Sequence, residues 1–276
     1  MLISETRQCN IYNLKQLALF LDCPTDILIK FYEELFLDEL LLGKINSTMD
    51  QVIYTHGFRK GIFSKGFLDN IDWFAYQRIL IYVLVRYLKP KHILETGVYY
   101  GGNTIFLLAA VMKNDFGTVH SVDLPDSQIS EITKKSDTND ILSRHRKVGD
   151  SELYDKSLTP GFLVPEYLKK RWEFIEGNSL EIIPTLDHQL DFYVHDSEHS
   201  FSFLDCELNV TLEKLTENAV IIIDDIGWSN AFFKFCVEHK LYPLLSTGNG
   251  KDDLMVRTGM VKMNHPYNRL LDVTGP

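Results

Sequence analysis

The most informative segment of the chain runs from His92 to Thr104 and reads HILETGVYYGGNT. It begins as an apolar strand, His92–Glu95, and passes through glycines into a predicted helix from Asn103 to about Met112. Glycine lets a backbone turn sharply and approach a ligand closely, and the first turn of a helix presents N–H groups without partners inside the helix. The arrangement is typical of a nucleotide-cofactor loop, although such turns between strand and helix also occur without a ligand.

Beyond this segment, strands alternate with helices, which is the pattern of a parallel sheet with helices on both faces. We therefore predict an α/β fold over residues 71–276, Rossmann-like, with a mostly parallel seven-stranded sheet. The expected strands are His92–Glu95, Thr118–Val122, Trp172–Glu176, Leu190–His195, Val220–Asp224, Leu241–Ser246 and Leu254–Thr258. A polar insertion at about 125–164 is too long for a simple connection, and we interpret it as a lid.

The first 70 residues show mainly helical signals and are interpreted as a helical appendage. Helices are predicted at Asn13–Leu21, from Thr25 as N-cap to about Leu42, and at Asp72–Leu88. A DNA-binding helix-turn-helix is disfavoured, because its reading helix would need basic or amide side chains. The second helix instead carries the acids Asp26, Glu33, Glu34, Asp38 and Glu39. Its apolar face is expected to pack on the main domain or on a second copy, as in a homodimer.

Composition narrows the class of protein. The chain has 276 residues, of which 45% are hydrophobic, so it can bury a large core. Its formal net charge of −10 opposes nucleic acid as a partner, because affinity for phosphate backbones comes from clustered Lys and Arg. We see no signal peptide and no apolar run of about 18 residues that could span a membrane. The four cysteines lack metal-ligand spacing, so reduced thiols in a cytoplasmic protein are expected.

The second predicted strand ends in Asp123. The two oxygens of a carboxylate can accept hydrogen bonds from the two vicinal hydroxyls of a ribose. We therefore predict that Asp123 binds the ribose of a cofactor, a role that would suit NAD as well as S-adenosylmethionine. The alternative is an acid that simply faces solvent at a strand end.

Three aspartates follow two neighbouring strands. Asp196 comes directly after Leu190–His195, and Asp224 and Asp225 stand together at the end of the next strand. Carboxylates packed side by side repel one another unless a cation compensates them, and hard oxygen ligands suit Mg²⁺ or a similar divalent ion. We predict a metal site formed by these three acids, the alternative being that one or two of them cap helices.

Taken in this order over residues 90–258, the motifs resemble those of class I S-adenosylmethionine-dependent methyltransferases. The loop reads Glu-x-Gly-x-x-x-Gly and departs from the Gly-x-Gly-x-x-Gly pattern of dinucleotide-binding enzymes. Within that class the chain is similar to the family of metal-dependent macrolide-sugar O-methyltransferases and cephalosporin-hydroxylase-associated proteins, with catechol O-methyltransferase more distant. The resemblance implies a divalent-metal-assisted O-methyltransferase that acts on a hydroxyl of a small molecule, sugar or polysaccharide unit.

The resemblance also implies roles for individual residues. Asp196, Asp224 and Asp225 match the metal ligands, and Asp225 stands where the catechol enzyme has Asn. His199 matches the position of that enzyme's Lys base, and imidazole is a competent base at neutral pH. His195 is a rival for this role or a structural histidine. The residues expected at the cofactor are Glu95, Gly97, Tyr99, Gly101, Asn103, Thr104, Asp123, Asn178, Ser179 and Asp196, with Asn178 near the adenine ring unless Asn178 or Ser179 is only an N-cap.

Other functions fit the sequence less well. A nicotinamide-dependent sugar oxidoreductase would share the ribose acid, but the chain lacks both the dinucleotide loop and an evident Tyr-x-x-x-Lys pair. A non-catalytic cofactor-binding scaffold would leave the aspartate cluster unexplained. A methyltransferase of macromolecules could share the fold, yet no Asn-Pro-Pro-Tyr-type loop for a flipped base is present.

Overall fold

The computed structural model describes residues 5–45, 47, 73–99, 101–124, 159–247 and 256–268. Tyr100 and most of the predicted lid, residues 125–158, lie outside the described residues. No helix in the described ranges is both long and apolar enough to cross a membrane.

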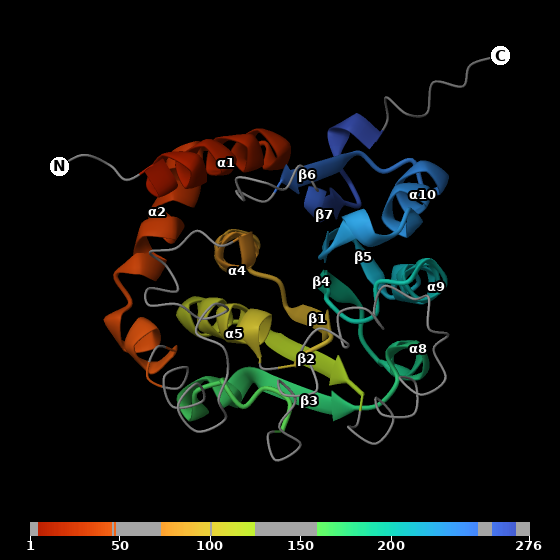
Figure 1. The fold of residues 1–276 in the computed structure, drawn as a ribbon, viewed down its shortest axis with the longest axis horizontal. Helices are drawn as coiled ribbons and strands as arrows, with labels where there is room; N and C mark the ends of the chain where they lie inside the picture. The colour runs from red at the N-terminus through yellow and green to blue at the C-terminus, as the bar shows by residue number, and fades with distance from the viewer. Residues whose placement is uncertain are drawn as a thin grey trace, which may run out of the picture.

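A seven-stranded sheet forms the centre of the molecule, in the order β3-β2-β1-β4-β5-β7-β6 (Figure 1). Neighbouring strands among the first five are parallel, whereas β7 runs antiparallel to both β5 and β6. The strands are β1 His92–Thr96, β2 Thr118–Asp123, β3 Trp172–Glu176, β4 Leu190–His195, β5 Leu215–Ile223, β6 Pro243–Thr247 and β7 Val256–Lys262. The predicted Rossmann-like, mostly parallel sheet is confirmed.

Helices cover both faces of this sheet (Figure 1). They are α1 Glu5–Leu21, α2 Thr25–Phe36, α4 Trp73–Leu88, α5 Gly102–Asn114, α8 Ser179–Ile182, α9 Phe201–Leu212 and α10 Ala231–Glu238. Alternate strand residues divide the core in two. Ile93 and its neighbours on one face pack with α1, α2, α4 and α5. Leu94 and its neighbours on the other face pack with α9 and α10. Parallel strands covered on both sides are therefore apolar on both sides, as the sequence indicated.

Several predicted boundaries were wrong. The first helix begins at Glu5 and not at Asn13, and β5 begins at Leu215 and not at Val220.

The second helix also differs from its prediction. The second helix was expected to run to Leu42 with Thr25 as its cap, but it ends at Phe36, and Pro24 occupies the cap position without a side-chain bond. A separate helical turn begins after Asp38, whose Oδ1 accepts the Leu41 N–H at 2.9 Å and so caps a new helix.

The last strand also extends further than expected, from Val256 to Lys262 and not from Leu254 to Thr258. Gly259 lies in its interior, where a Cβ atom would come within 2.4 Å of the Phe232 ring. Glycine inside a strand weakens the sequence signal, and here it admits close packing of α10 on the sheet.

The N-terminal helices share a core with the rest of the protein. Leu28 and Leu35 of α2 are completely buried. Beside them, the Arg86 guanidinium of α4 donates to both carboxylate oxygens of Glu34, at 2.6 and 2.9 Å, and the Tyr82 hydroxyl donates to the same group at 2.6 Å. A bidentate pair of this kind fixes orientation as well as distance, so α2 is held in one position on α4.

Glu95 connects three strands to α5. Its buried carboxylate accepts hydrogen bonds from the hydroxyls of Thr104, at 2.8 and 2.9 Å, and of Ser121, at 2.6 Å. The indole N–H of Trp172 donates to the Ser121 hydroxyl at 2.9 Å and so brings in β3. Burial raises the pKa of Glu95 to about 7, because the hydrogen bonds offset only part of the cost of taking the charge out of water.

This raised pKa predicts a pH-dependent stability. The folded state holds a proton on Glu95 that the unfolded chain releases near its ordinary pKa of 4.5. The protonated Glu95 therefore stabilises the folded state by about 3 kcal/mol below pH 4.5, and this contribution is lost as the pH rises through about 7. In urea titrations from about pH 5 to about pH 8, we expect the free energy of unfolding to fall by this amount relative to Glu95→Gln. A difference between the two proteins that does not change with pH would contradict the assignment.

Candidate active site

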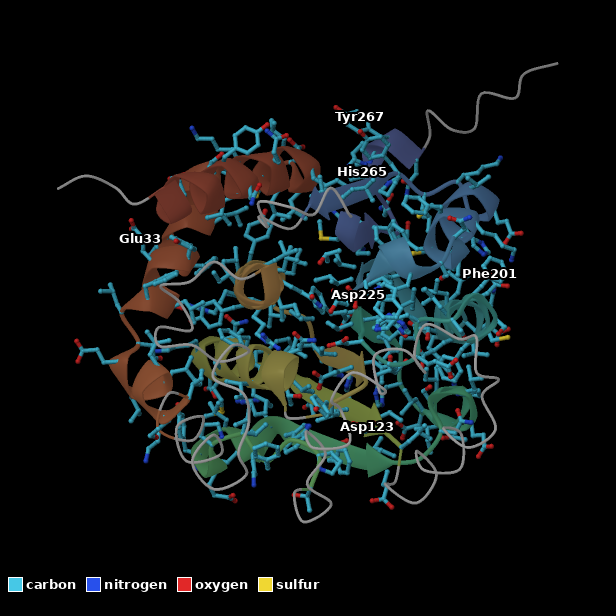
Figure 2. The ribbon with its side chains drawn as sticks, viewed as in Figure 1. Glu33, Asp123, Phe201, Asp225, His265 and Tyr267 are labelled. Carbon is cyan, nitrogen blue, oxygen red and sulfur yellow. The ribbon has the colours of Figure 1, made fainter. Side chains whose placement is uncertain are left out.

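The carboxyl ends of β1, β2, β4 and β5 lie at one edge of the sheet, where ligands bind in open α/β folds. Figure 2 labels Asp123 and Asp225, which stand at the ends of β2 and β5. The glycine loop after β1, the loop after β4 and the turn after β5 meet at this edge. The polar residues predicted for the site lie on these segments, on β1, β2 and β4, on α5, and at the start of α8.

Gly97 allows the loops after β1 and β4 to touch. Its φ angle is +82°, and a Cβ atom would lie 2.1 Å from the carbonyl oxygen of Asp196. The two loops are joined at the same place, since the Asp196 N–H donates to the carbonyl of Thr96 at 2.8 Å. Any other residue at Gly97 would push Asp196 away from the glycine loop.

Asp123 shapes the glycine loop from the end of β2. Its Oδ2 accepts the backbone N–H groups of Val98, at 2.9 Å, and Tyr99, at 2.8 Å, and its Oδ1 accepts the N–H of Leu124 at 2.8 Å. Tyr99 has a left-handed φ of 47° and exposes 42% of its surface. These three N–H groups use most of the roughly four acceptor positions of the carboxylate and fix the shape of the loop. Gly101, with φ +88°, stands at the N-cap of α5.

Four predicted cofactor residues use their side chains within the protein. Asn103 donates to Asp196 Oδ2 at 2.8 Å, and the Thr104 hydroxyl donates to Glu95. Asn178 is the N-cap of α8 and accepts the Leu180 N–H at 3.0 Å. Ser179 is buried and hydrogen-bonds to the carboxylate of Glu207 on α9. The two alternatives for the Gly-Asn-Ser turn are compatible, because a capping side chain leaves the backbone of the turn open to a ligand.

Asp196 and Asp224 lie next to each other at the ends of β4 and β5. Burial, followed by the negative charges of Asp224 and Asp225, raises the pKa of Asp196 well above its usual range. Burial and the charge of Asp225 raise the pKa of Asp224 to about 7. Two carboxyl groups in this position favour a shared proton or a cation between them.

The third predicted ligand is less closely placed. Asp225 begins the 3₁₀ turn Ile226–Trp228 with a left-handed φ of 47°. Within the described ranges, one set of three potential metal ligands has its ligand atoms within 4.8 Å of one another, and it consists of three histidines elsewhere. The structure thus brings Asp196 and Asp224 together and leaves Asp225 outside that distance.

Helix α4 supplies two site residues that sequence reasoning missed. Gln77 and Arg78 are each only 4% exposed. With its amide nitrogen facing the carboxylate, Gln77 donates to both oxygens of Asp224 at 2.8 and 3.0 Å. The Arg78 guanidinium occupies the space at Gly102, where a Cβ would lie 2.3 Å from Nη2. Its positive charge acts to lower the pKa of Asp196 and Asp224. A Gln-Arg pair inside the otherwise apolar stretch WFAYQRILIYVLV was the available signal.

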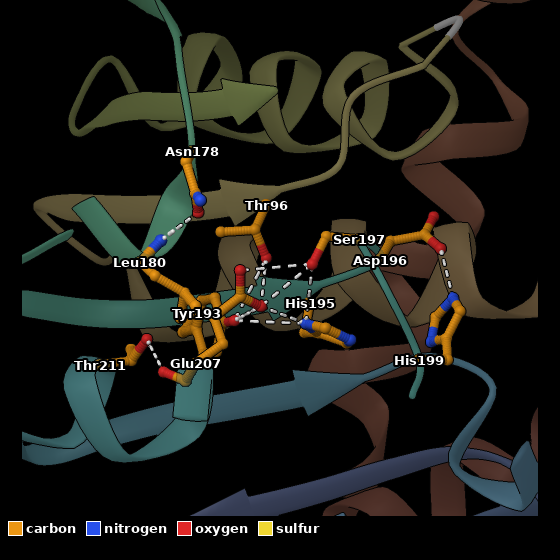
Figure 3. A network of polar contacts seen from close by, with 10 residues as sticks. All are labelled: Thr96, Asn178, Leu180, Tyr193, His195, Asp196, Ser197, His199, Glu207 and Thr211. Atoms are coloured by element: carbon orange, nitrogen blue, oxygen red, sulfur yellow. Dashed lines mark hydrogen bonds and ion pairs between the residues drawn. The ribbon is translucent and has the colours of Figure 1, made fainter. Parts of the chain in front are cut away.

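His195 belongs to a buried network below the site (Figure 3). Its Nδ1 contacts the carboxylate of Glu207 on α9, and both side chains are completely buried. Glu207 also accepts hydrogen bonds from Tyr193, at 2.8 Å, and from Thr96 and Ser197, each at 3.1 Å. Burial raises the pKa of Glu207, but the charge and hydrogen bond of His195 together with the other donors outweigh it, so the net pKa is lowered.

Sequence reasoning missed Glu207 as well. It stands three residues after Leu204 and one before Leu208, on the apolar stripe of α9. A carboxylate at that position must have a buried partner, which was the available signal. The network holds His195 and Ser197 on either side of Asp196, and thereby positions the loop after β4.

His199 lies at the edge of the site, with Nε2 3.9 Å from Asp196 Oδ1 (Figure 3). Its ring stands edge-on to His195, with centroids 5.3 Å apart. Burial and the neighbouring charge of His195 lower the pKa of His199 to about 3. The imidazole is therefore neutral at neutral pH and has a lone pair that can accept a proton.

Comparisons with known proteins agree with this architecture. Residues 94–226 match a family model described as a methyltransferase domain. The O-methyltransferase from Bacillus cereus, in complex with SAH, is similar with a TM-score of 0.50 and 14% identity, over 79% of this chain and 90% of that one. No curated protein sequence matches the chain.

Two further solved structures are similar at lower scores. The SAH-bound methyltransferase of Podospora anserina has a TM-score of 0.43 and 16% identity, over 68% of this chain and 77% of that one. The O-methyltransferase of Streptomyces achromogenes involved in tomaymycin synthesis, in complex with SAM, has a TM-score of 0.42 and 15% identity, over 68% and 79%. Residues 94–226 therefore match a methyltransferase domain, and the sheet around them has the class I fold of S-adenosylmethionine-dependent methyltransferases.

Proposed function

We propose that this protein transfers the methyl group of S-adenosylmethionine to a hydroxyl of a small molecule, sugar or polysaccharide unit, assisted by a divalent cation. One observation carries the proposal. Asp224 is buried, and Asp196 beside it is partly exposed and attached to the cofactor loop by Asn103 and by the close contact of Gly97. A methyl donor bound on that loop would have an anionic, cation-binding group beside it.

The cofactor part rests on the glycine loop and Asp123. The glycines would let the loop backbone come close to a cofactor, and α5 begins there with N–H groups that have no partner inside the helix. Asp123 stands at the end of β2, where it would accept a ribose hydroxyl, and its bonds to the N–H groups of Val98 and Tyr99 hold the loop in place. The O-methyltransferase from Bacillus cereus, which has the same fold, is in complex with SAH.

The metal part rests on the chemistry of the donors. Asp196 and Asp224 are oxygen ligands of the kind that Mg²⁺ prefers, and their raised pKa values reflect a repulsion that a cation would relieve. Asp225, on the next turn, would be the third oxygen ligand. When bound, the ion supplies a Lewis acid that stabilises negative charge on the acceptor oxygen.

The remaining tasks belong to side chains. Methyl transfer is an in-line displacement, so the acceptor oxygen must be held opposite the sulfur of the cofactor. His199, neutral and beside Asp196, is the side chain that would accept the proton of the acceptor hydroxyl. Its lowered pKa makes it a weaker base than a free imidazole, so the acceptor hydroxyl would have to be acidic. The His195–Glu207 pair would keep the loop that carries Asp196 and His199 in position. Arg78 would balance part of the negative charge of the site.

The sheet argues against the nicotinamide alternative. Dinucleotide-binding sheets have the order 3-2-1-4-5-6, whereas here the antiparallel β7 lies between β5 and β6. A non-catalytic scaffold would have no use for two adjacent acids whose pKa values are raised. We expect the protein to act in the cytoplasm without a nucleic-acid partner. A homodimer would cover Leu19, Leu37 and Leu40, which are more than half exposed on the N-terminal helical segments.

The cofactor assignment predicts the behaviour of Asp123→Ala. Loss of the ribose acceptor should weaken S-adenosylmethionine binding about 10- to 100-fold in calorimetric titrations, the usual effect of removing hydrogen bonds to a charged group. Asp123→Asn, which keeps one acceptor oxygen, should bind with intermediate affinity. The exposed Asp115→Ala is the matched control and should bind normally. Unchanged affinity of Asp123→Ala, or binding of NAD in place of S-adenosylmethionine, would refute the assignment.

The metal assignment predicts a division of roles. Asp224→Asn should lower Mg²⁺-stimulated turnover at least about 100-fold, while S-adenosylmethionine affinity changes less than about threefold. Formation of S-adenosylhomocysteine, measured over a panel of catechols and sugars with and without Mg²⁺, gives the rate. If turnover of the wild-type protein is independent of added metal and of chelator, the metal part of the proposal fails and the cofactor part stands.

A further inference from the structure

Three histidines meet at the amino ends of the strands, at the edge of the sheet opposite the proposed methyl-transfer site. His92 is the first residue of β1, His120 lies on β2, and His188 is in the turn that enters β4. Each offers a ring nitrogen, and the three nitrogens lie within 4.8 Å of one another. The Nδ1 atom of His92 is 3.2 Å from the Nε2 atom of His120.

Two carboxylates lie beside these rings. Asp187 Oδ1 is hydrogen-bonded to His188 Nδ1 at 2.9 Å, and Glu173 Oε2 lies 2.8 Å from His120 Nδ1, a close contact without hydrogen-bond geometry. A carboxylate beside Nδ1 favours the tautomer that carries its proton there, which leaves the lone pair on Nε2. The Nε2 atom of His188 is buried, and no residue in the described ranges hydrogen-bonds to it. The Nε2 atom of His120 is hydrogen-bonded to His92 Nδ1, a bond that an ion between the rings would replace.

This arrangement is that of metal-binding histidines. A ligating histidine usually donates its second ring N–H to a carboxylate, which fixes the ring and makes it a better ligand. Nitrogens bound to one tetrahedral ion at about 2.0–2.1 Å are about 3.3 Å apart, close to the spacing of His92 and His120. We propose that His92, His120 and His188 bind a divalent transition-metal ion with a preference for nitrogen ligands, Zn²⁺ being the ion of choice.

The type of ligand atom distinguishes the two proposed metal sites. Nitrogen ligands separate the site from the Asp196–Asp224 pair, which offers the oxygen ligands that suit Mg²⁺.

The rings must move slightly for all three to bind. His92 and His188 stack with centroids 4.1 Å apart, and His120 and His188 lie at 4.3 Å. Binding therefore requires rotation of at least one ring about a side-chain bond, so that its nitrogen points at the ion. This rotation gives a measurable signature, since the imidazole NMR signals should shift on addition of metal. An ion here would join β1, β2 and the turn before β4.

Calorimetric titration of tag-free, chelator-treated protein with Zn²⁺ tests the proposal. Excess Mg²⁺ is added to compete for the aspartate pair, so that Zn²⁺ bound by the aspartates does not contribute to the signal. We expect one equivalent of Zn²⁺ per chain and a zinc-dependent rise in Tm. His188→Ala, in a partly exposed turn, should lower the affinity about 100-fold and abolish the rise in Tm. Binding of S-adenosylmethionine should be unchanged in this variant, which separates the result from the proposed function.

A second variant tests the carboxylate that orients His120. The side chain of Glu173 is 63% exposed and is not part of the core, so the Glu173→Gln variant should fold normally. It should bind Zn²⁺ about 10- to 100-fold more weakly than the wild type. Glu217→Gln, another exposed glutamate on a strand, is the matched control and should bind as the wild type does. The absence of Zn²⁺ binding by the wild-type protein overturns the proposal. So does binding that survives both His188→Ala and Glu173→Gln, because the ion would then sit elsewhere.

Discussion

The closeness of Asp196 to Asp224 is the constraint on which the rest of the site depends. Asp224 is buried and the side chain of Asp196 is 30% exposed, and two carboxyl groups so close together are unfavourable unless other groups compensate them. Asn103 donates to one and Gln77 to the other, and the Arg78 guanidinium lies close enough to act on both. The polar residues Gln77 and Arg78 of α4 and Asn103 of α5 are therefore explained by their contacts with Asp196 and Asp224, which lie outside both helices.

Compensation of the two acids also accounts for details of the backbone. A side chain on Gly102 would occupy the space of the Arg78 guanidinium, and a side chain on Gly97 would collide with the carbonyl of Asp196. Gly102 thus leaves room for the Arg78 guanidinium, and Gly97 lets the loop that carries Asp196 come close to the glycine loop. On the other side of the loop, Glu207 gathers donors from Tyr193, His195 and Ser197 and prevents the segment from shifting.

Much of this architecture follows from local sequence, because strands buried on both faces and a glycine-rich turn leave strong local signals. The residues that were missed share a different property. Gln77, Arg78 and Glu207 are polar residues on apolar helices, and their meaning depends on contacts with distant segments. His92 and His120 are 28 residues apart, and only the pairing of β1 with β2 brings them together. Asp225 was expected beside Asp196 and Asp224, and its charge acts on both, but the three acids do not form one of the sets of described residues whose ligand atoms lie within 4.8 Å of one another.

The two clusters lie at opposite ends of the same strands, and this gives them a mechanical connection. β1 has His92 at one end and leads into Gly97 at the other, and β2 carries His120 and ends in Asp123. Parallel strands are paired residue by residue, from His92 with Thr118 to Thr96 with Val122. A shift of one strand at the histidine end would therefore move Asp123 relative to the glycine loop whose N–H groups it holds. An ion that joins β1, β2 and the entry to β4 would resist such a shift without contact with cofactor or acceptor.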